Sequence, residues 1–422
     1  MNNSTMNVGG NLTIQPGAIA GATFNGNTGT VNIAGNLTTT SGGAGPVTTF
    51  NGGTGTFNFN GSGSQTISGT LSPTFFNLTD SNTTQPLAIN TSIGVGGTLN
   101  VNGATAILGP AAASIISGAG TLTGSGTARV TRTAATADFL SQYTITNKTL
   151  TNLTVEYIGS GAAQIANALT YNQLKINNTS GVNLAAGTTT VNGLLTLTNG
   201  ALGVGTNTLV INNGSSAAMG SITSAVTGTV NYNQGSAGQN VLAFNYGNLT
   251  FSNQNKVLAG AGTIGIAGTF TPGTAVGHTV TGSTINFNGT GAQTVPAFTY
   301  DNLTISGARG ANNVTLINGG VIFVAGAFNP TATFAGGSYV VTGNTVNFNG
   351  GGAQTIPAFN YNNLTSSGAG ARTLANAGTI GVAGTFSPGA NTYTNTGSTI
   401  NFNGTGAQTI PAFSYNLSLI HI

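Results

Sequence analysis

The sequence predicts an all-β chain that forms a β-solenoid (parallel β-helix) from imperfect repeats, each of them about 55–60 residues long. Three observations predict this fold. A short strand-and-turn segment recurs with both its turn residues and its apolar residues, apolar and polar residues alternate within it, and no stretch has the 3.6-residue apolar stripe of a helix. Self-similarity at a regular spacing decides the architecture first, because each copy builds the same small unit.

The recurring segment is clearest in the C-terminal half of the chain. The copies that begin at Gly282 and Gly343 read GSTINFNGTGAQTVPAFTYDNLTISG and GNTVNFNGGGAQTIPAFNYNNLTSSG, and a third begins at Gly397. Fainter copies run over Phe57–Leu78, Val155–Ile176 and Val230–Phe251. A phenylalanine near the centre of each copy marks the register, at Phe244, Phe298, Phe359 and Phe413, and the middle interval is longer than the two outer ones. We therefore expect irregular solenoid repeats over residues 1–227, regular repeats over 228–416, and a tail at 417–422 that belongs to no repeat.

Short strands and tight turns are expected within each copy. Ile285 and Phe287 alternate with Thr284 and Asn286, the period-two pattern of a half-buried strand. Asn-Gly pairs, which tolerate positive φ, mark turns and occur at Asn60-Gly61, Asn288-Gly289, Asn349-Gly350 and Asn403-Gly404. The repeat is too short for an immunoglobulin-like sandwich of about 100 residues, and its uneven spacing and lack of a blade signature argue against a propeller. Each repeat would divide into about three stacked coils of roughly 20 residues.

The composition restricts the classes of function. Only 3% of the residues are charged, and the polar character comes from Asn, Thr, Ser and Gln, whose side chains can form hydrogen-bonded ladders when coils stack. The net charge of +3 rests on few groups, and Arg129 with Arg132 is too small a basic patch for nucleic acid. The absence of cysteine excludes disulfides and thiolate chemistry. No signal peptide or membrane-spanning run is visible, so we expect a fragment whose export and anchoring segments lie elsewhere; the tail LSLIHI, Leu417–Ile422, resembles translated sequencing-adapter sequence.

Carboxylate chemistry is the first candidate, because many solenoids act on polysaccharides and need two carboxylates about 5 to 9 Å apart. The acidic residues are Asp80, Asp138, Glu156 and Asp301. Only Asp138 and Glu156 are separated by close to the length of one coil. We expect both to be solvated or turn residues. A calcium repeat would need an acid in every copy, and Asn362 replaces Asp301 in the next copy.

The other candidate sites also have simpler structural interpretations. His278 and His421 lack the partners of a catalytic triad or metal site. The GxGxxG string at Gly260, Gly262 and Gly265 lacks the following helix and acidic residue of a dinucleotide site. The sequence therefore predicts no catalytic, cofactor-binding or metal-binding residue and no cofactor.

Two recurring residue types leave a binding role open. Glutamines share a register at Gln65, Gln164, Gln293, Gln354 and Gln408, with Gln239 close to it. We favour amides stacked along the solenoid, with a row of ligand-binding residues as the alternative. Aromatic pairs recur at Phe298-Tyr300, Phe359-Tyr361 and Phe413-Tyr415. We expect the phenylalanines in the core and the tyrosines at an edge, with an exposed row that stacks on sugars as the alternative.

Threonine alternation and sequons carry weaker signals. An ice-binding face needs a T-x-T row on every coil, and here the pattern is sporadic, as at Thr269-Phe270-Thr271. Asn-x-Thr sequons such as those at Asn248 and Asn302 are interpreted first as strand and turn chemistry, and only second as glycosylation sites.

The repeat style resembles that of large β-strand-repeat surface proteins of Bacteroidota-type bacteria, and more distantly haemagglutinin-like and autotransporter adhesin repeats. The resemblance rests on Ser283–Gly307 and its sister copies, on TARVTRTAATADFLSQYTITN at Thr127–Asn147, and on Leu194–Gly214. It implies an exported or outer-membrane-associated, adhesin-like protein; a C-terminal sorting domain, frequent in such proteins, is not seen in this sequence.

The expected function is therefore that of a structural or adhesive rod segment at the cell surface, without catalysis. Its partners would be surface glycans or proteins, and copies would associate end to end through exposed strand edges. The alternative is a solenoid carbohydrate-active enzyme or a carbohydrate-binding module, which a cluster of acids in one groove or an exposed row of aromatic side chains would favour.

Overall fold

The computed structural model describes residues 4–16, 22–41, 48–133, 137–159 and 161–415. Nearly all regular structure in these residues is parallel β, in coils stacked as a β-solenoid, so the predicted fold class is confirmed. The one helix of the described residues, α1 (Phe139–Gln142), has four residues. None of the described helical structure is long and apolar enough to cross a membrane. His421 and the tail lie outside the described residues.

The chain divides into two compact units. Unit 1 comprises Met1–Gly203 with Leu209–Ser221, and unit 2 comprises Val204–Thr208 with Ile222–Ile422. The division into irregular and regular repeats at residue 227 rests on sequence regularity and stays a prediction.

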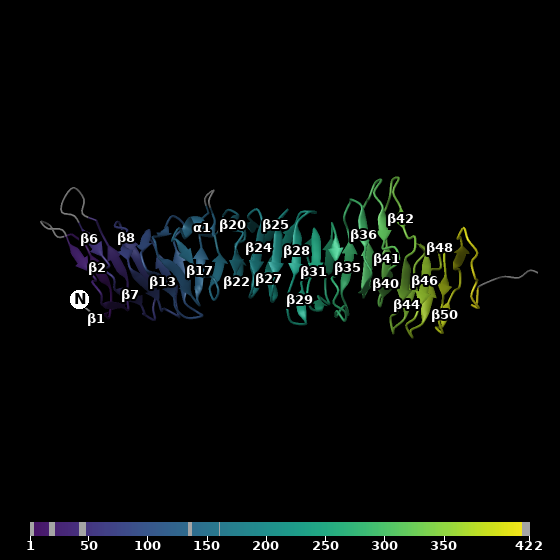
Figure 1. Cartoon of the computed structure of the whole chain (residues 1–422), viewed down its shortest axis with the longest axis horizontal. Helices are drawn as coiled ribbons and strands as arrows, with labels where there is room; N and C mark the ends of the chain where they lie inside the picture. Colours follow the sequence, from purple (N-terminus) through teal and green to yellow (C-terminus); the bar gives the residue numbers. More distant parts are fainter. Residues whose placement is uncertain (1–3, 17–21, 42–47, 134–136, 160, 416–422) are drawn as a thin grey trace, which may run out of the picture. The chain divides into compact units, whose positions relative to one another are not determined.

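Unit 1 is a stack of coils, most of which give one strand to each of three parallel sheets (Figure 1). The first sheet contains β1 (Thr5–Val8), β4 (Thr30–Ile33), β7 (Thr56–Phe59), β10 (Asn77–Asp80), β13 (Thr98–Val101), β16 (Thr121–Gly124) and β18 (Asn147–Lys148). The second contains β2 (Leu12–Ile14), β5 (Leu37–Thr39), β8 (Gln65–Gly69), β11 (Leu87–Ile89), β14 (Ile107–Pro110), β17 (Thr127–Val130), β19 (Thr154–Tyr157), β22 (Gln173–Asn177), β25 (Leu195–Gly205), β23 (Val182–Leu184) and β20 (Gln164–Ala166). The third contains β3 (Thr23–Asn25), β6 (Thr49–Asn51), β9 (Thr74–Phe75), β12 (Ile93–Val95) and β15 (Ile116–Ser117). The pair β21 (Thr170–Tyr171) and β24 (Thr188–Val191) follows; β26 (Thr208–Ile211) and β27 (Ser215–Ser224) lie where the sequence ranges of the two units alternate.

Unit 2 repeats the same plan of stacked parallel strands. Its first strands are β28 (Thr229–Tyr232), β31 (Asn248–Phe251) and β34 (Phe270–Thr271), beside β29 (Gln239–Val241) and β32 (Lys256–Leu258). Two five-stranded sheets contain β30 (Asn245–Tyr246), β33 (Thr263–Ile266), β35 (Thr284–Phe287), β38 (Asn302–Ile305) and β41 (Phe328–Pro330), and β37 (Phe298–Tyr300), β40 (Val321–Val324), β43 (Thr345–Phe348), β46 (Asn363–Ser366) and β49 (Phe386–Ser387). Three-stranded sheets contain β36 (Gln293–Val295), β39 (Val314–Leu316) and β42 (Tyr339–Val340), then β44 (Gln354–Ile356), β47 (Arg372–Leu374) and β50 (Tyr393–Thr394), then β45 (Asn360–Tyr361), β48 (Thr379–Val382) and β51 (Thr399–Phe402).

Alternation along each strand builds an apolar core inside the coils. Ile285 and Phe287 of β35 are buried, and in register they follow Ile264 and Ile266 of the preceding coil. The outward residues form polar ladders, as the composition predicts. The amide nitrogen of Asn32 donates to Asn7 Oδ1 at 2.8 Å, and that of Asn58 donates to Asn32 Oδ1 at 3.0 Å. Stacking therefore lets an outward asparagine donate to the asparagine of the preceding coil.

The sequence repeat and the structural coil differ in length. One coil of unit 2 uses three strands, because β35 pairs with β38 and β38 pairs with β41. The repeat, however, advances by eight strands, from β35 to β43 and then to β51, and these three equivalent strands lie in three different sheets. The expected value of about three coils per repeat is close, and the repeat spans two coils and two strands of a third. Since eight strands are one fewer than three full coils, each copy lies on a different face from the copy before it.

Candidate functional site

The two acids with coil-like spacing are engaged in separate structural roles. Asp138 is the N-cap of α1, where its carboxylate accepts hydrogen bonds from the backbone N–H and the hydroxyl of Ser141, each at 2.8 Å. It also accepts from the side-chain amide of Asn167 at 3.3 Å. These bonds satisfy the exposed start of the helix, so the expectation of a turn residue holds for Asp138.

Glu156 lies in strand β19, and its expected solvation is wrong. Its carboxylate is only 1% exposed and forms ion pairs with Arg129 at 2.8 Å and Lys175 at 2.9 Å, which are its register partners on β17 and β22. Burial alone would raise the pKa of Glu156, but hydrogen bonds and charge from Arg129 and Lys175 hold the pKa below its ordinary value. A carboxylate held in this way is a structural anion, not a general acid that is protonated near neutral pH.

The remaining acids differ sharply in environment. Asp301 accepts a hydrogen bond from the backbone N–H of Gly282 at 2.7 Å and so joins two coils. Asp80 is fully buried at the end of β10, in register with Phe59 and Val101. Its Oδ1 accepts from Asn82 N at 3.1 Å, whereas its Oδ2 has no hydrogen-bond partner. Burial raises the pKa of Asp80 to about 7.

The recurring glutamine is a clamp between coils, which supports the structural interpretation. Gln293 Oε1 accepts from Gly289 N at 3.0 Å, and Nε2 donates to the carbonyl oxygens of Ile266 and Gly268 in the preceding coil, both at 2.8 Å. The same three bonds recur, with equivalent partners, at Gln65, Gln164, Gln354 and Gln408. The expected stacking of amide on amide is wrong, because each amide binds backbone. Both ends of these five amides are engaged in hydrogen bonds to the backbone, which argues against a ligand-binding row of glutamines.

A second donor completes the clamp from the following coil. Arg309 is 1% exposed, and its NH1 donates to Gln293 Oε1 at 2.6 Å while NH2 donates to the Phe287 carbonyl at 2.6 Å. Asn178 fills the equivalent place in unit 1, donating to Gln164 Oε1 at 3.0 Å. The buried guanidinium of Arg309 is therefore held by carbonyl oxygens of a turn, which are the negative ends of peptide dipoles.

Aromatic residues form a second repeated cluster, and the expected edge position of the tyrosines is wrong. Tyr300 and Tyr361 are at most 1% exposed, and are buried more deeply than Phe298 and Phe359, at 8% each. The Tyr300 hydroxyl donates to the Pro296 carbonyl at 3.1 Å, which satisfies its polar end inside the core. The two buried tyrosines cannot contribute to an exposed row of sugar-stacking rings.

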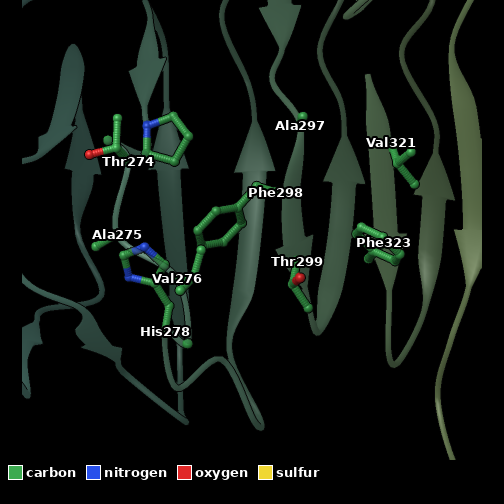
Figure 2. Close-up of a pocket in the computed structure, with 12 residues that line it drawn as sticks. Thr274, Ala275, Val276, His278, Ala297, Phe298, Thr299, Val321 and Phe323 are labelled. Carbon is green, nitrogen blue, oxygen red and sulfur yellow. The ribbon is translucent and has the colours of Figure 1, made fainter. Parts of the chain in front are cut away.

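One groove lies beside this cluster (Figure 2). It has a volume of about 470 Å³ and is lined by the loop Pro272–His278, by Ala297–Thr299, and by Val321 and Phe323. The ring of His278 is tilted by 49° against that of Phe298, with centroids 5.2 Å apart. Its Nδ1 accepts a hydrogen bond from Lys256 N at 3.0 Å. Burial, together with the positive charge of Lys256, lowers the pKa of the imidazole. His278 is therefore a neutral structural ring at the groove.

The groove has a related copy elsewhere in unit 2. Another hollow is lined by Pro388–Tyr393 and Ala412–Ser414, where Tyr393 packs on Phe413 with centroids 4.8 Å apart, as His278 packs on Phe298. Neither lining contains an acid. Within the described ranges, no three His, Cys, Asp or Glu side chains gather in a way that could hold a metal ion. Gly265 of the GxGxxG string lies inside strand β33, where no helix follows to cradle a phosphate.

Comparison with known proteins finds no matching family model, no matching curated protein and no matching solved structure. The resemblance to bacterial surface repeats stays a prediction.

Replacing Gln293 with Leu should lower the free energy of unfolding of unit 2 by about 3 kcal/mol, because the carbonyls of Ile266 and Gly268 and the NH1 group of Arg309 lose a buried partner. Denaturant unfolding of the whole chain measures this. Thr294→Val, at the exposed neighbouring position, is the control and should change little. Equal stability of the two variants would contradict the clamp.

His278 should make unit 2 less stable as the pH falls. Its folded-state pKa lies below the unfolded value, so its contribution is complete above about pH 6.5 and is lost as the pH falls through the folded pKa. A protonated Nδ1 could no longer accept from Lys256 N. Hydrogen exchange of Lys256–Leu258 should accelerate in mildly acidic solution in the native chain but not in His278→Tyr, which introduces the residue found at the equivalent positions 339 and 393. The same acid response in both chains would exclude this role.

Proposed function

We propose that this chain is a non-catalytic spacer and attachment segment of a repeat protein on a bacterial cell surface. The observation that carries the proposal is the use of the acidic side chains. Asp138 caps a helix, Glu156 is enclosed by two cations, Asp301 joins coils, and Asp80 is buried inside. No pair of these carboxylates is left to act as acid and nucleophile.

The stacked coils support a mechanical role. Parallel ladders, asparagine ladders and glutamine clamps all run from one coil to the next, so the unit resists separation of its coils through many bonds that share the load. Successive copies lie on different faces of unit 2, so equivalent outward surfaces are presented on three faces. This arrangement supports attachment in several directions. Weak contacts multiplied over copies would give avidity to partners that surround the segment, such as surface glycans or proteins.

The composition and the resemblance to surface repeats support the extracellular location that we propose. Only 3% of the residues of the chain are charged, none is cysteine, and outward asparagines form ladders, a composition that fits a repeat protein in an extracellular setting. The alternative of a carbohydrate-active enzyme or carbohydrate-binding module gains no support from the acids or from the buried tyrosines.

Two measurements test the proposal together. The purified chain, coupled to beads, is assayed for release of reducing ends or unsaturated sugars from acidic and neutral polysaccharides, and for retention of bacterial and host cells. We expect cell retention that rises steeply with bead loading, and no sugar release. Sugar release that is abolished in Asp138→Asn or Glu156→Gln would overturn the non-catalytic assignment, and absence of retention at every loading would overturn the attachment role.

The chain should also associate end to end in solution. Ile285 and Phe287 of β35 are 1% and 0% exposed, whereas the equivalent Ile400 and Phe402 of the last described strand, β51, are partly exposed. Covering such an apolar edge with another coil buries surface and pairs a free strand.

Sedimentation velocity over a range of concentrations checks this association. The native chain should form oligomers as its concentration rises, and Ile400→Asp should shift it to monomers. Val276→Asp, at an 87% exposed side position, is the matched control and should behave like the native chain. Monomers of the native chain at every concentration would contradict the prediction.

A further inference from the structure

Two of the clear copies of unit 2, those that begin at Gly282 and Gly343, place an arginine against the carbonyl oxygens of the turn that follows the repeated strand. In the copy that contains Arg372, each of the three guanidinium nitrogens has its own hydrogen-bond partners. Nε donates to Ser366 Oγ at 2.8 Å, NH1 donates to the Gly352 carbonyl at 3.2 Å, and NH2 donates to the carbonyls of Phe348 and Gly350 at 3.1 and 3.0 Å. Arg372 is fully buried and has no acidic partner among these contacts.

The copy of unit 1 that begins at Phe57 has the same backbone arrangement with a different set of side chains. Asp80 ends the segment NLTD as Ser366 ends NLTS, and the register places Asp80 beside Phe59 as it places Ser366 beside Phe348. Ser81 N donates to the Phe59 carbonyl at 2.8 Å, as Ser367 N donates to Phe348 at 3.2 Å. Asp80 is therefore equivalent to Ser366, whose side chain accepts a hydrogen bond from the guanidinium of Arg372.

Only one of the three guanidinium positions is filled in this copy. The amide nitrogen of Asn82 donates to the Gly63 carbonyl at 2.7 Å and to Gln65 Oε1 at 3.2 Å, which corresponds to the NH1 position. No cationic side chain follows within the turn, since residues 81–86 read SNTTQP. Meanwhile, Asp80 Oδ2 is buried without a hydrogen-bond partner. A buried carboxylate of this kind is ordinarily paired or coordinates a cation, because leaving it alone in an apolar core is costly.

We propose that Asp80 Oδ2 and the Phe59 carbonyl oxygen bind a monovalent hard cation, with Na⁺ as the probe, in the place that the arginine guanidinium takes in unit 2. Carboxylate and carbonyl oxygens are the ligands that hard cations prefer. A single charge fits because the site has one carboxylate, and because the group it replaces carries one positive charge. This site is independent of the proposed attachment role.

The test compares hydrogen exchange of the whole chain in sodium chloride and in tetramethylammonium chloride at equal ionic strength, above the pKa of Asp80. Na⁺ should slow exchange of the amides over residues 77–90 several-fold. The segment 302–316 is an internal control, because Arg309 fills the same place covalently there and exchange should not respond to the salt. Broadening of the ²³Na resonance by the chain supplies a second, direct readout.

Three variants separate cation binding from folding. Asp80→Ile copies Ile305 of the equivalent segment NLTI, and should fold while losing both the exchange response and the ²³Na broadening. Asp80→Asn should lose them as well. Thr84→Arg introduces a guanidinium four residues after Asp80, as Arg309 lies four residues after Ile305, and should make exchange slow in both salts.

Three results would overturn the proposal. One is identical exchange of residues 77–90 in both salts for the native chain, and another is an undiminished Na⁺ response in Asp80→Ile. The third is protection by Ca²⁺ without protection by Na⁺, which would assign a divalent site.

Discussion

The hydrogen bonds that pass from one coil to the next are the constraint on which the rest of this structure depends. A strand in a solenoid has its backbone partners in the neighbouring coils, whereas some N–H and carbonyl groups of the turns between strands are bonded by side chains. One glutamine per copy satisfies those turns by receiving a turn N–H and donating to two carbonyls of the previous coil, as Gln293 does. Asparagine acts similarly on the outer surface: Asn302 donates to Ser283 O and accepts from Ala327 N, which lie in the coils on either side. Neutral amides serve both roles because they donate and accept at once.

The same clamps explain how repeat and coil can have different lengths. Each clamp joins a turn to the coil directly before it and needs no identical partner one coil away. The sequence can therefore repeat every eight strands while the backbone closes a coil every three strands. Successive copies such as β35, β43 and β51 are then distributed over different sheets. Identical side chains are not aligned in one row along unit 2, so a flat, regular binding face of one residue type does not arise from this repeat.

Much of the fold follows from the sequence pattern, because alternation and Asn-Gly turns are local signals. The inward positions of Ile285 and Phe287, the parallel stacking and the near absence of helix were predictable. The burial of Tyr300 and Glu156 was not, because each depends on a partner brought close only by folding: the Pro296 carbonyl in the folded turn for the tyrosine, and Arg129 and Lys175 on neighbouring coils for the glutamate. The placement of successive copies on different faces could not be predicted either, because the uneven spacing of the copies does not reveal how many strands form one coil. Counting eight strand-like segments per repeat against three per coil is the signal that could have shown it.

The placement of charge links the fold to the proposed role. Several of the few ionisable side chains are bound within the structure: Arg309 and Arg372 are buried against turn carbonyls, and Glu156 pairs with the partly exposed Arg129 and Lys175. The outer surface is then left nearly neutral and is built from amide and hydroxyl ladders. Such a surface makes weak and short-ranged contacts, because it lacks the charge that steers or anchors a partner at a distance. A segment with this surface gains useful affinity only by repetition, and the rotation of its copies around unit 2 provides that repetition in more than one direction.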